Sequence, residues 1–195
     1  MIAMAKKYEF KPDKSGTGFF SKLYLTPKQR KSILRWALYG LVLLVLSVAQ
    51  DVVLCHVDIL GATTDLVPCG IFLICLVEGS EKSCIFSLIA SALYVFSGSS
   101  QGYYCMVFIV FLAILFSIFR QAFLQKGFLA TLLCAALSLL VYGYLNFAMA
   151  LFLGKTIASG WLAPLICVGL NLPAIVVLYP ICSAIETLGG NTWNE

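Results

Sequence analysis

Apolar stretches separated by short polar turns cover the chain from about residue 33 onward. The run from Cys84 to Arg120 is the clearest case, because two apolar segments without charged side chains flank the Ser/Gly-rich turn Ser97–Gly102. Each segment is somewhat shorter than the ~20 residues that cross a bilayer untilted. Lipid cannot satisfy the backbone groups of a turn, so this turn belongs at a membrane surface. The pattern predicts a helical hairpin in a bilayer.

Six membrane helices are predicted along the whole chain. The expected spans lie at about 33–54, 65–77, 84–96, 103–119, 127–153 and 162–185. The second span is the shortest, and Pro68 and Gly70 are expected to interrupt or bend it, which leaves both crossing and re-entry open. Pro164, Pro173 and Pro180 are expected to bend the last span. The predicted fold class is all-α, a polytopic membrane protein.

The composition points to the same class. Hydrophobic residues make up 61% of the 195 residues and charged residues only 11%, against about 25% charged in soluble domains. A water-exposed surface cannot be assembled from such a chain. We therefore expect a basic cytoplasmic tail at 1–32, a transmembrane domain at 33–186 and a second cytoplasmic tail at 187–195.

Positive charge is concentrated at the start of the chain. Nine of the thirteen Lys and Arg residues precede Trp36, namely Lys6, Lys7, Lys11, Lys14, Lys22, Lys28, Arg30, Lys31 and Arg35. With six spans and a cytoplasmic N-terminus, the inner loops add Lys82, Arg120 and Lys126, whereas the outer loops contain only Lys155. This bias follows the positive-inside rule and predicts that both termini are cytoplasmic. No nucleic-acid-binding motif accompanies the basic tail, so its expected partner is anionic lipid.

Candidate catalytic chemistry is sparse. The only histidine is His56, in the run Cys55-His56-Val57-Asp58, and the only further carboxylates close to it in sequence are Asp51 and Asp65. A metal site would need further ligands, so we interpret His56 as a loop residue. The chain contains no H-E-x-x-H, G-x-S-x-G or phosphate-binding glycine motif, and none of its eight cysteines forms a C-x-x-C pair. We expect no catalytic residues, no metal and no cofactor, and hence no enzyme.

A few polar and small residues lie inside the predicted spans. Asn146 and Asn171 could bond across helices or line a ligand cavity, and we favour the interhelical hydrogen bond. Tyrosines near them and near the central turn, such as Tyr142, are interpreted as packing residues rather than as pocket walls. Small residues at Ser87 and Ala90–Ala92 should let the third span approach its neighbours closely.

This layout resembles the rod shape-determining protein MreD family. That family has a similar length, cytoplasmic ends, five or six spans and a short proline-containing second span. Its second span typically opens with Pro-Asp followed by aliphatic residues. The corresponding run here is Thr64-Asp65-Leu66-Val67-Pro68, in which Asp65 and Pro68 match the pattern in residue type.

The hairpin turn and the fourth span carry the rest of the resemblance. The family pattern is D-x-x-S-G-x-x-x-G, and Ser97, Gly98 and Gly102 fit it, whereas Tyr94 replaces the Asp. Arg120 lies where the family tends to carry a base. The resemblance implies a non-catalytic scaffold of the bacterial cell-elongation and peptidoglycan-synthesis machinery in the plasma membrane. It also implies contacts with an MreC-like bitopic protein, an MreB-like filament and peptidoglycan synthases.

A second hypothesis comes from another functional class. Substrate-binding subunits of energy-coupling-factor vitamin transporters are similar in length, number of spans and position of the termini. The outer acidic residues, Trp161 and the Asn and Tyr residues would then form a vitamin pocket near the outer face. Such subunits typically carry A-x-x-x-A on the first span, and that pattern is missing here. We therefore prefer the scaffold.

Overall fold

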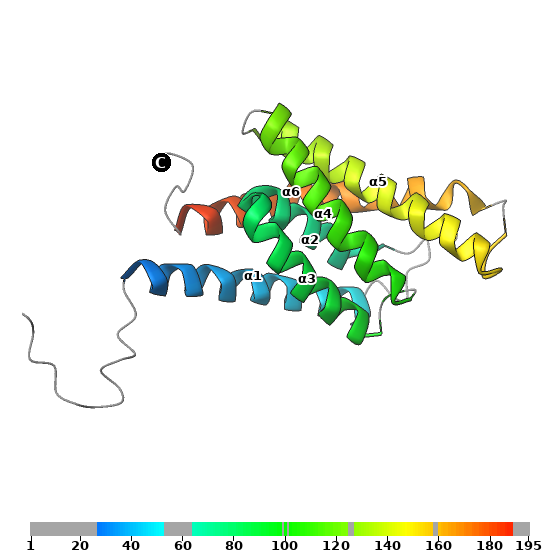
Figure 1. Cartoon of the computed structure of the whole chain (residues 1–195), viewed down its shortest axis with the longest axis horizontal. Coiled ribbons are helices and arrows are strands. Elements are labelled where there is room, and N and C mark those ends of the chain that lie inside the picture. Colours follow the sequence, from blue (N-terminus) through cyan, green and yellow to red (C-terminus); the bar gives the residue numbers. More distant parts are fainter. Residues whose placement is uncertain are drawn as a thin grey trace, which may run out of the picture.

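The computed structural model describes residues 27–52, 64–98, 100, 102–124, 127–157 and 160–188, and its helices form one bundle (Figure 1). The described residues contain six α-helices and no strand. The helices are α1 (Pro27–Val52), α2 (Leu66–Glu78), α3 (Ser80–Phe96), α4 (Tyr104–Phe123), α5 (Phe128–Phe152) and α6 (Ala163–Leu188). The predicted all-α fold is confirmed, and the hairpin predicted between Cys84 and Arg120 corresponds to α3 and α4.

Consecutive helices run in opposite directions. The start of α1 lies beside the end of α2, where Arg35 and Glu78 form an ion pair. The start of α2 lies beside the end of α1, where Gln50 bonds to Val67. Figure 1 shows the beginning of α1 and the end of α6 at the same side of the bundle, which we call the terminal end. We call the opposite side the cavity end.

The short helix α2 is the centre of the bundle. Every residue from Val67 to Glu78 is buried, and α2 contacts each of the other five helices. Its 13 residues rise about 20 Å, less than the ~30 Å of a hydrocarbon core. Helix α2 is therefore sheltered by protein rather than by lipid.

The predicted interruption of the second span is wrong. Helix α2 is continuous from Leu66 to Glu78. Pro68 is its third residue, where the backbone N–H would have no partner within the helix anyway. Gly70 lies under α1, since a Cβ there would be 2.5 Å from the Leu46 side chain. Both residues fit a continuous helix that is packed closely against its neighbour.

Helix α3 presents its small residues to the bundle. Ser87, Ala90 and Ser91 are buried, and α3 packs against α2 and α4, which confirms the predicted close approach. The turn from α2 to α3 consists of Gly79 alone, whose φ of 95° favours glycine. The last helix, α6, continues through Pro173 and Pro180.

Four of the helices in the described residues are long and apolar enough to cross a bilayer. These are α1 from Arg30 onward, α4, α5 and α6 as far as Thr187. They display many exposed Leu, Ile, Val and Phe side chains, such as Leu44 and Leu129, which suit lipid. These features identify a helical, multi-pass membrane protein.

Candidate functional site

A cavity of about 520 Å³ opens at the cavity end of the bundle, within the usual size range of small-molecule sites. It lies among α4, α5, α6, the residue that precedes α2 and the segment between α5 and α6. Polar groups from each of these elements line it: Asp65, Tyr104, Tyr142, Asn146, Lys155 and Asn171. Apolar and aromatic side chains such as Phe147 form the rest of its wall.

Helical spacing brings the lining residues of α5 and α6 together. Tyr142 and Asn146 are four residues apart on α5 and so share one face of that helix. Cys167 and Asn171 have the same spacing on α6. Gly143 allows the two helices to approach, because a Cβ at this position would lie only 3.1 Å from Cβ of Pro164.

The two membrane asparagines differ in their bonding. Asn146 Oδ1 accepts a hydrogen bond from the Cys105 thiol on α4 at 3.4 Å, so the predicted interhelical bond is confirmed for Asn146. Asn171 Nδ2 donates to Cys167 Sγ at 3.5 Å within the same helix. The interhelical bond predicted for Asn171 is therefore wrong. Its side chain lines the cavity instead, and only 1% of the residue is exposed.

Two buried polar atoms at this cavity lack hydrogen-bond partners within the described residues. They are Asn171 Oδ1 and the Tyr104 hydroxyl. An unsatisfied buried polar atom costs about 1–3 kcal/mol, which makes such atoms uncommon unless a ligand or water completes them. The cavity therefore has hydrogen-bonding capacity that the described protein does not use.

Asp65 is the carboxylate of the cavity. It is half-buried just before α2, and its surroundings raise the pKa of its carboxyl group to about 6 through desolvation. The ion pairs found in the described part of the chain do not include Asp65. Lys155 lines the same cavity from the exposed segment that follows α5, but it does not pair with Asp65.

A second polar cluster at this end positions the start of α2. Gln50 Oε1 accepts the backbone N–H of Val67 at 2.9 Å, one of the four N–H groups that lack partners at any helix start. Tyr94 is 4% exposed, and its hydroxyl interacts with Gln50 and Tyr142. Tyrosine thus takes part in a buried polar cluster at the position where the resembled family has Asp.

At the terminal end, Arg35 and Glu78 form a buried ion pair of 2.8 Å with side chains only 4% exposed. Lys82 lies 3.8 Å from the same carboxylate. This pair was not predicted from the sequence, in which Arg35 was grouped with the other cations at the start of the chain. A signal was present, since each residue directly adjoins an apolar run.

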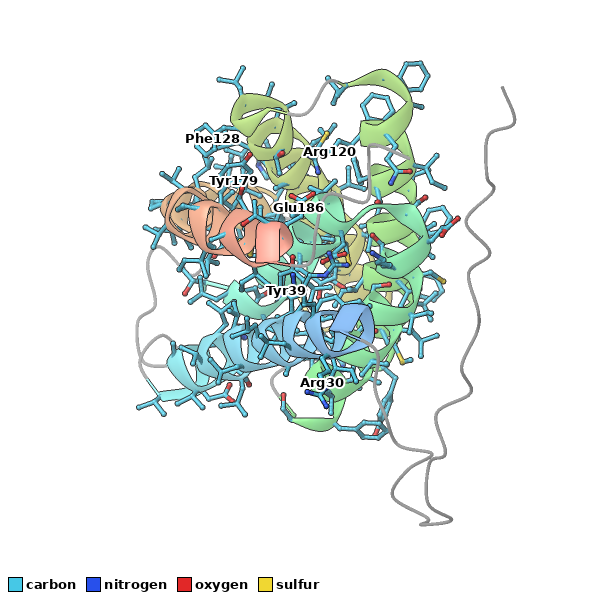
Figure 2. All side chains as sticks on the ribbon, turned by 90° about the vertical axis from the view of Figure 1, so that its left-hand side faces the viewer. Arg30, Tyr39, Arg120, Phe128, Tyr179 and Glu186 are labelled. Atoms are coloured by element: carbon cyan, nitrogen blue, oxygen red, sulfur yellow. The ribbon has the colours of Figure 1, made fainter. Side chains whose placement is uncertain are left out.

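Side chains from α3 and α4 satisfy the last carbonyls of α2. The Arg120 guanidinium donates to the Leu76 carbonyl, and Ser83 and Ser117 donate to the Cys75 carbonyl at 2.6 Å and 3.2 Å. Figure 2 looks onto this end and shows Arg120 on α4 above the end of α6. The C-terminal end of α2 is therefore capped by its neighbours.

The hairpin-turn residues have local structural roles. Ser97 ends α3, and its hydroxyl donates to the Tyr94 carbonyl at 2.8 Å. Gly98 has a φ of 80°, which favours glycine. Gly102 lies against the Tyr104 ring and leaves no space for a side chain, since a Cβ at Gly102 would be 2.6 Å from that ring. These three positions shape the turn and lie outside the cavity lining.

Two other residues of the predicted outer region, Asp51 and Trp161, do not line the cavity. Asp51 is exposed on the last turn of α1, and Trp161 is 56% exposed and not part of the lining. His56 and Asp58 lie outside the described residues. Among the described residues, no three His, Cys, Asp or Glu side chains are grouped so that they could hold a metal ion.

Comparisons of the chain with known protein families, curated proteins and solved structures give no match.

Proposed function

We propose that the chain is a non-catalytic integral membrane scaffold of the bacterial cell-elongation and peptidoglycan-synthesis machinery. The bond from Arg120 to the Leu76 carbonyl carries this proposal. Arg120 is the position where the MreD family tends to carry a base, and the bond gives that base a structural role at the C-terminal end of α2. A cation at the C-terminal end of a helix neutralises the partial negative charge of its free carbonyls, so Arg120 secures the buried centre of the bundle.

The proposed topology has six crossing helices, with both termini in the cytoplasm of a bacterial plasma membrane. Arg35, Lys82 and Arg120 lie toward the terminal end, whereas Lys155 lies at the cavity end. The positive-inside rule then assigns the terminal end to the cytoplasm. Helix α2 crosses within the bundle rather than through lipid, which explains how so short a segment serves as a span.

An apolar groove between α1 and α6 supplies a contact surface for an MreC-like bitopic partner. It is lined by Leu38, Leu41, Val42, Pro180, Ile181, Ala184 and Ile185 and has a volume of about 560 Å³. The groove is apolar throughout, as expected of a surface that receives one transmembrane helix. The small residue Ala184 would let a partner backbone approach closely. Contacts with an MreB-like filament, with peptidoglycan synthases and with anionic lipid are proposed for the cytoplasmic side.

The first test is purification in mild detergent with mass spectrometry of co-purifying proteins and small molecules. Recovery of an MreC-like protein or a peptidoglycan synthase supports the scaffold. A photo-crosslinking residue at Ala184 should capture the bitopic partner, whereas one at Leu133, an apolar residue 58% exposed on α5, should not. Equal capture at both positions would contradict the groove as the contact site.

A cellular test addresses the role itself. Depletion should make rod-shaped cells round, and re-expression should restore the rods. Because Arg120 caps the central helix, Arg120→Ala should restore shape poorly, while Lys155→Ala, which removes a cation at the other end, should restore it fully. Normal shape after depletion would overturn the proposal.

One observation favours a second candidate function. The polar cavity at the proposed outer face suits a substrate-binding subunit of an energy-coupling-factor vitamin transporter. In that case the same purification would recover ATPase subunits together with a stoichiometric vitamin. Recovery of elongation proteins without ATPase subunits would exclude it.

A further inference from the structure

The cavity presents hydrogen-bond acceptors that no described donor satisfies. Asn171 Oδ1 is buried and unpartnered, and the Asp65 carboxylate has no ion-pair partner in the part of the chain that the structure describes. Both side chains line the same space. An acceptor-rich cavity is completed by a ligand that donates hydrogen bonds.

We propose that this cavity binds a small organic molecule through a protonated amine, held by the Asp65 carboxylate and Asn171 Oδ1. An ammonium group carries three N–H donors and no acceptor. One donor meets the carboxylate in a charge-assisted bond and a second meets the amide oxygen. The Tyr104 hydroxyl, which also lines the cavity without a partner among the described residues, offers a further acceptor for the ligand.

The rest of the wall suits an organic cation. Tyr104, Tyr142 and Phe147 place aromatic rings around the space, and such rings attract ammonium groups through their π faces. A volume of about 520 Å³ holds a small molecule rather than a bare ion. An anion is disfavoured, because Asp65 would repel it and the one lysine of the lining, Lys155, belongs to an exposed segment.

The cavity is reached from the cavity end. Lys155, Thr156 and Gly160 from the segment between α5 and α6 contribute to its lining. In the proposed topology this is the outer face, so the amine would arrive from outside the cell. The inference rests on the cavity alone and holds whether the protein is a scaffold or a transporter subunit.

Three phenols of nearly equal shape test the inference on the intact protein in nanodiscs of zwitterionic lipid. Tyramine carries the ammonium group, tyrosol replaces it with a neutral hydroxyl, and 4-hydroxyphenylacetate replaces it with a carboxylate. Affinities are measured by NMR titration at pH 7.5, with empty nanodiscs as the blank. Tyramine should bind at least tenfold more tightly than tyrosol, and the carboxylate should bind more weakly still.

Matched variants locate the binding. Asp65→Asn keeps the shape of the side chain and removes its charge, so the preference for tyramine over tyrosol should disappear. Asp51→Asn removes an exposed carboxylate outside the cavity lining and should leave that preference intact. Asn171→Leu removes the unpartnered amide oxygen and should weaken tyramine binding severalfold.

The wild-type comparison decides the matter even if a variant fails to fold. Equal binding of tyramine and tyrosol by the wild-type protein would overturn the proposal, as would a preference that survives in Asp65→Asn. Amine binding by a protein whose depletion leaves cell shape unchanged would support this inference while contradicting the scaffold. The two proposals can therefore fail separately.

Discussion

Single residues determine what each end of the bundle can do. At the cavity end, Asp65 and Asn171 leave acceptor capacity open to a ligand. At the terminal end, Arg35 and Glu78 neutralise each other inside the protein. At the terminal end the protein itself supplies the partner of each buried charge, whereas at the cavity end we propose that a ligand supplies it.

Binding of tyramine should weaken as the pH falls from 7.5 to 5. The pKa of Asp65 is raised to about 6, so the carboxylate is charged above that pH and neutral below it. At pH 5 about a tenth of it remains ionised, which predicts roughly a tenfold loss of affinity. The other titratable groups around it are Tyr94, Tyr142, Cys167 and Lys155, whose residue types ordinarily titrate above this range.

The same NMR titration at several pH values checks this dependence, with Asp65→Asn as the control. The variant has no charge to lose, so its weak binding should stay flat across the range. A wild-type affinity that does not change between pH 7.5 and pH 5 would contradict the role of Asp65.

Removing one partner of the buried ion pair should destabilise the protein strongly. Glu78→Ala leaves the Arg35 charge buried without its partner, which typically costs about 3–5 kcal/mol. The double variant Arg35→Leu/Glu78→Leu removes both charges and should recover most of that loss. Glu81→Ala removes an exposed carboxylate in the first turn of α3, three residues further along the chain. It is the matched control and should change stability little.

Thermal unfolding midpoints in one detergent measure all of these variants. A midpoint for Glu78→Ala equal to that of Glu81→Ala would show that the pair contributes nothing. A double variant less stable than Glu78→Ala would show that the charges themselves are needed.

At the scale of helices, hydrophobic pattern and turn residues predicted most boundaries. Helix α2 begins at Leu66 and ends at Glu78, within a residue of the predicted span. The burial of α2 on every side could not be predicted, because an apolar segment looks the same whether lipid or protein surrounds it. For that reason Pro68 was wrongly expected to interrupt a span, although it lies in the first turn of a continuous helix.

The candidate site was predictable only in its parts. Asn146 and Asn171 stood out as polar residues in apolar spans, yet their spacing along the chain could not show that one bonds across helices and the other faces a cavity. Arg35 and Glu78 are far apart in sequence. The residues next to each of them indicate only a charge at a membrane interface. Their pairing depends on α1 and α2 being antiparallel neighbours.

The approach of α5 to α6 should be sensitive to a single methyl group at Gly143. A Cβ there would lie 3.1 Å from Cβ of Pro164, so α6 must shift slightly, whereas a Cβ at Gly169 meets nothing within 4 Å. Gly169→Ala should be neutral or stabilising by up to about 1 kcal/mol, as alanine favours helices. Gly143→Ala should be about 1 kcal/mol or more less stable than Gly169→Ala.

Because Gly143 also lines the cavity, its alanine variant should bind tyramine more weakly, and the Gly169 variant should bind normally. Thermal unfolding and NMR titration on the same samples measure both effects. Equal stability and equal binding of the two variants would mean that the packing of α5 against α6 tolerates an added methyl group at Gly143.

Across the whole molecule, the two ends of the bundle differ in kind. The terminal end is closed by an ion pair and by side chains that cap the carbonyls of α2. The cavity end is open, with acceptors left free. The orientation of the bundle in the membrane therefore decides which side of the membrane has access to the cavity.

That orientation can be measured by thiol labelling. Lys155→Cys places a thiol on an exposed residue at the cavity end, and Glu81→Cys places one on an exposed residue at the terminal end. In intact cells a membrane-impermeant maleimide should modify the first variant and spare the second, and after permeabilisation it should modify both. The native Cys84, near the start of α3, should likewise resist labelling from outside, with the wild-type protein as the background. Labelling of Glu81→Cys but not of Lys155→Cys in intact cells would reverse the topology. The cavity would then face the cytoplasm, and any amine that it binds would have to come from inside the cell.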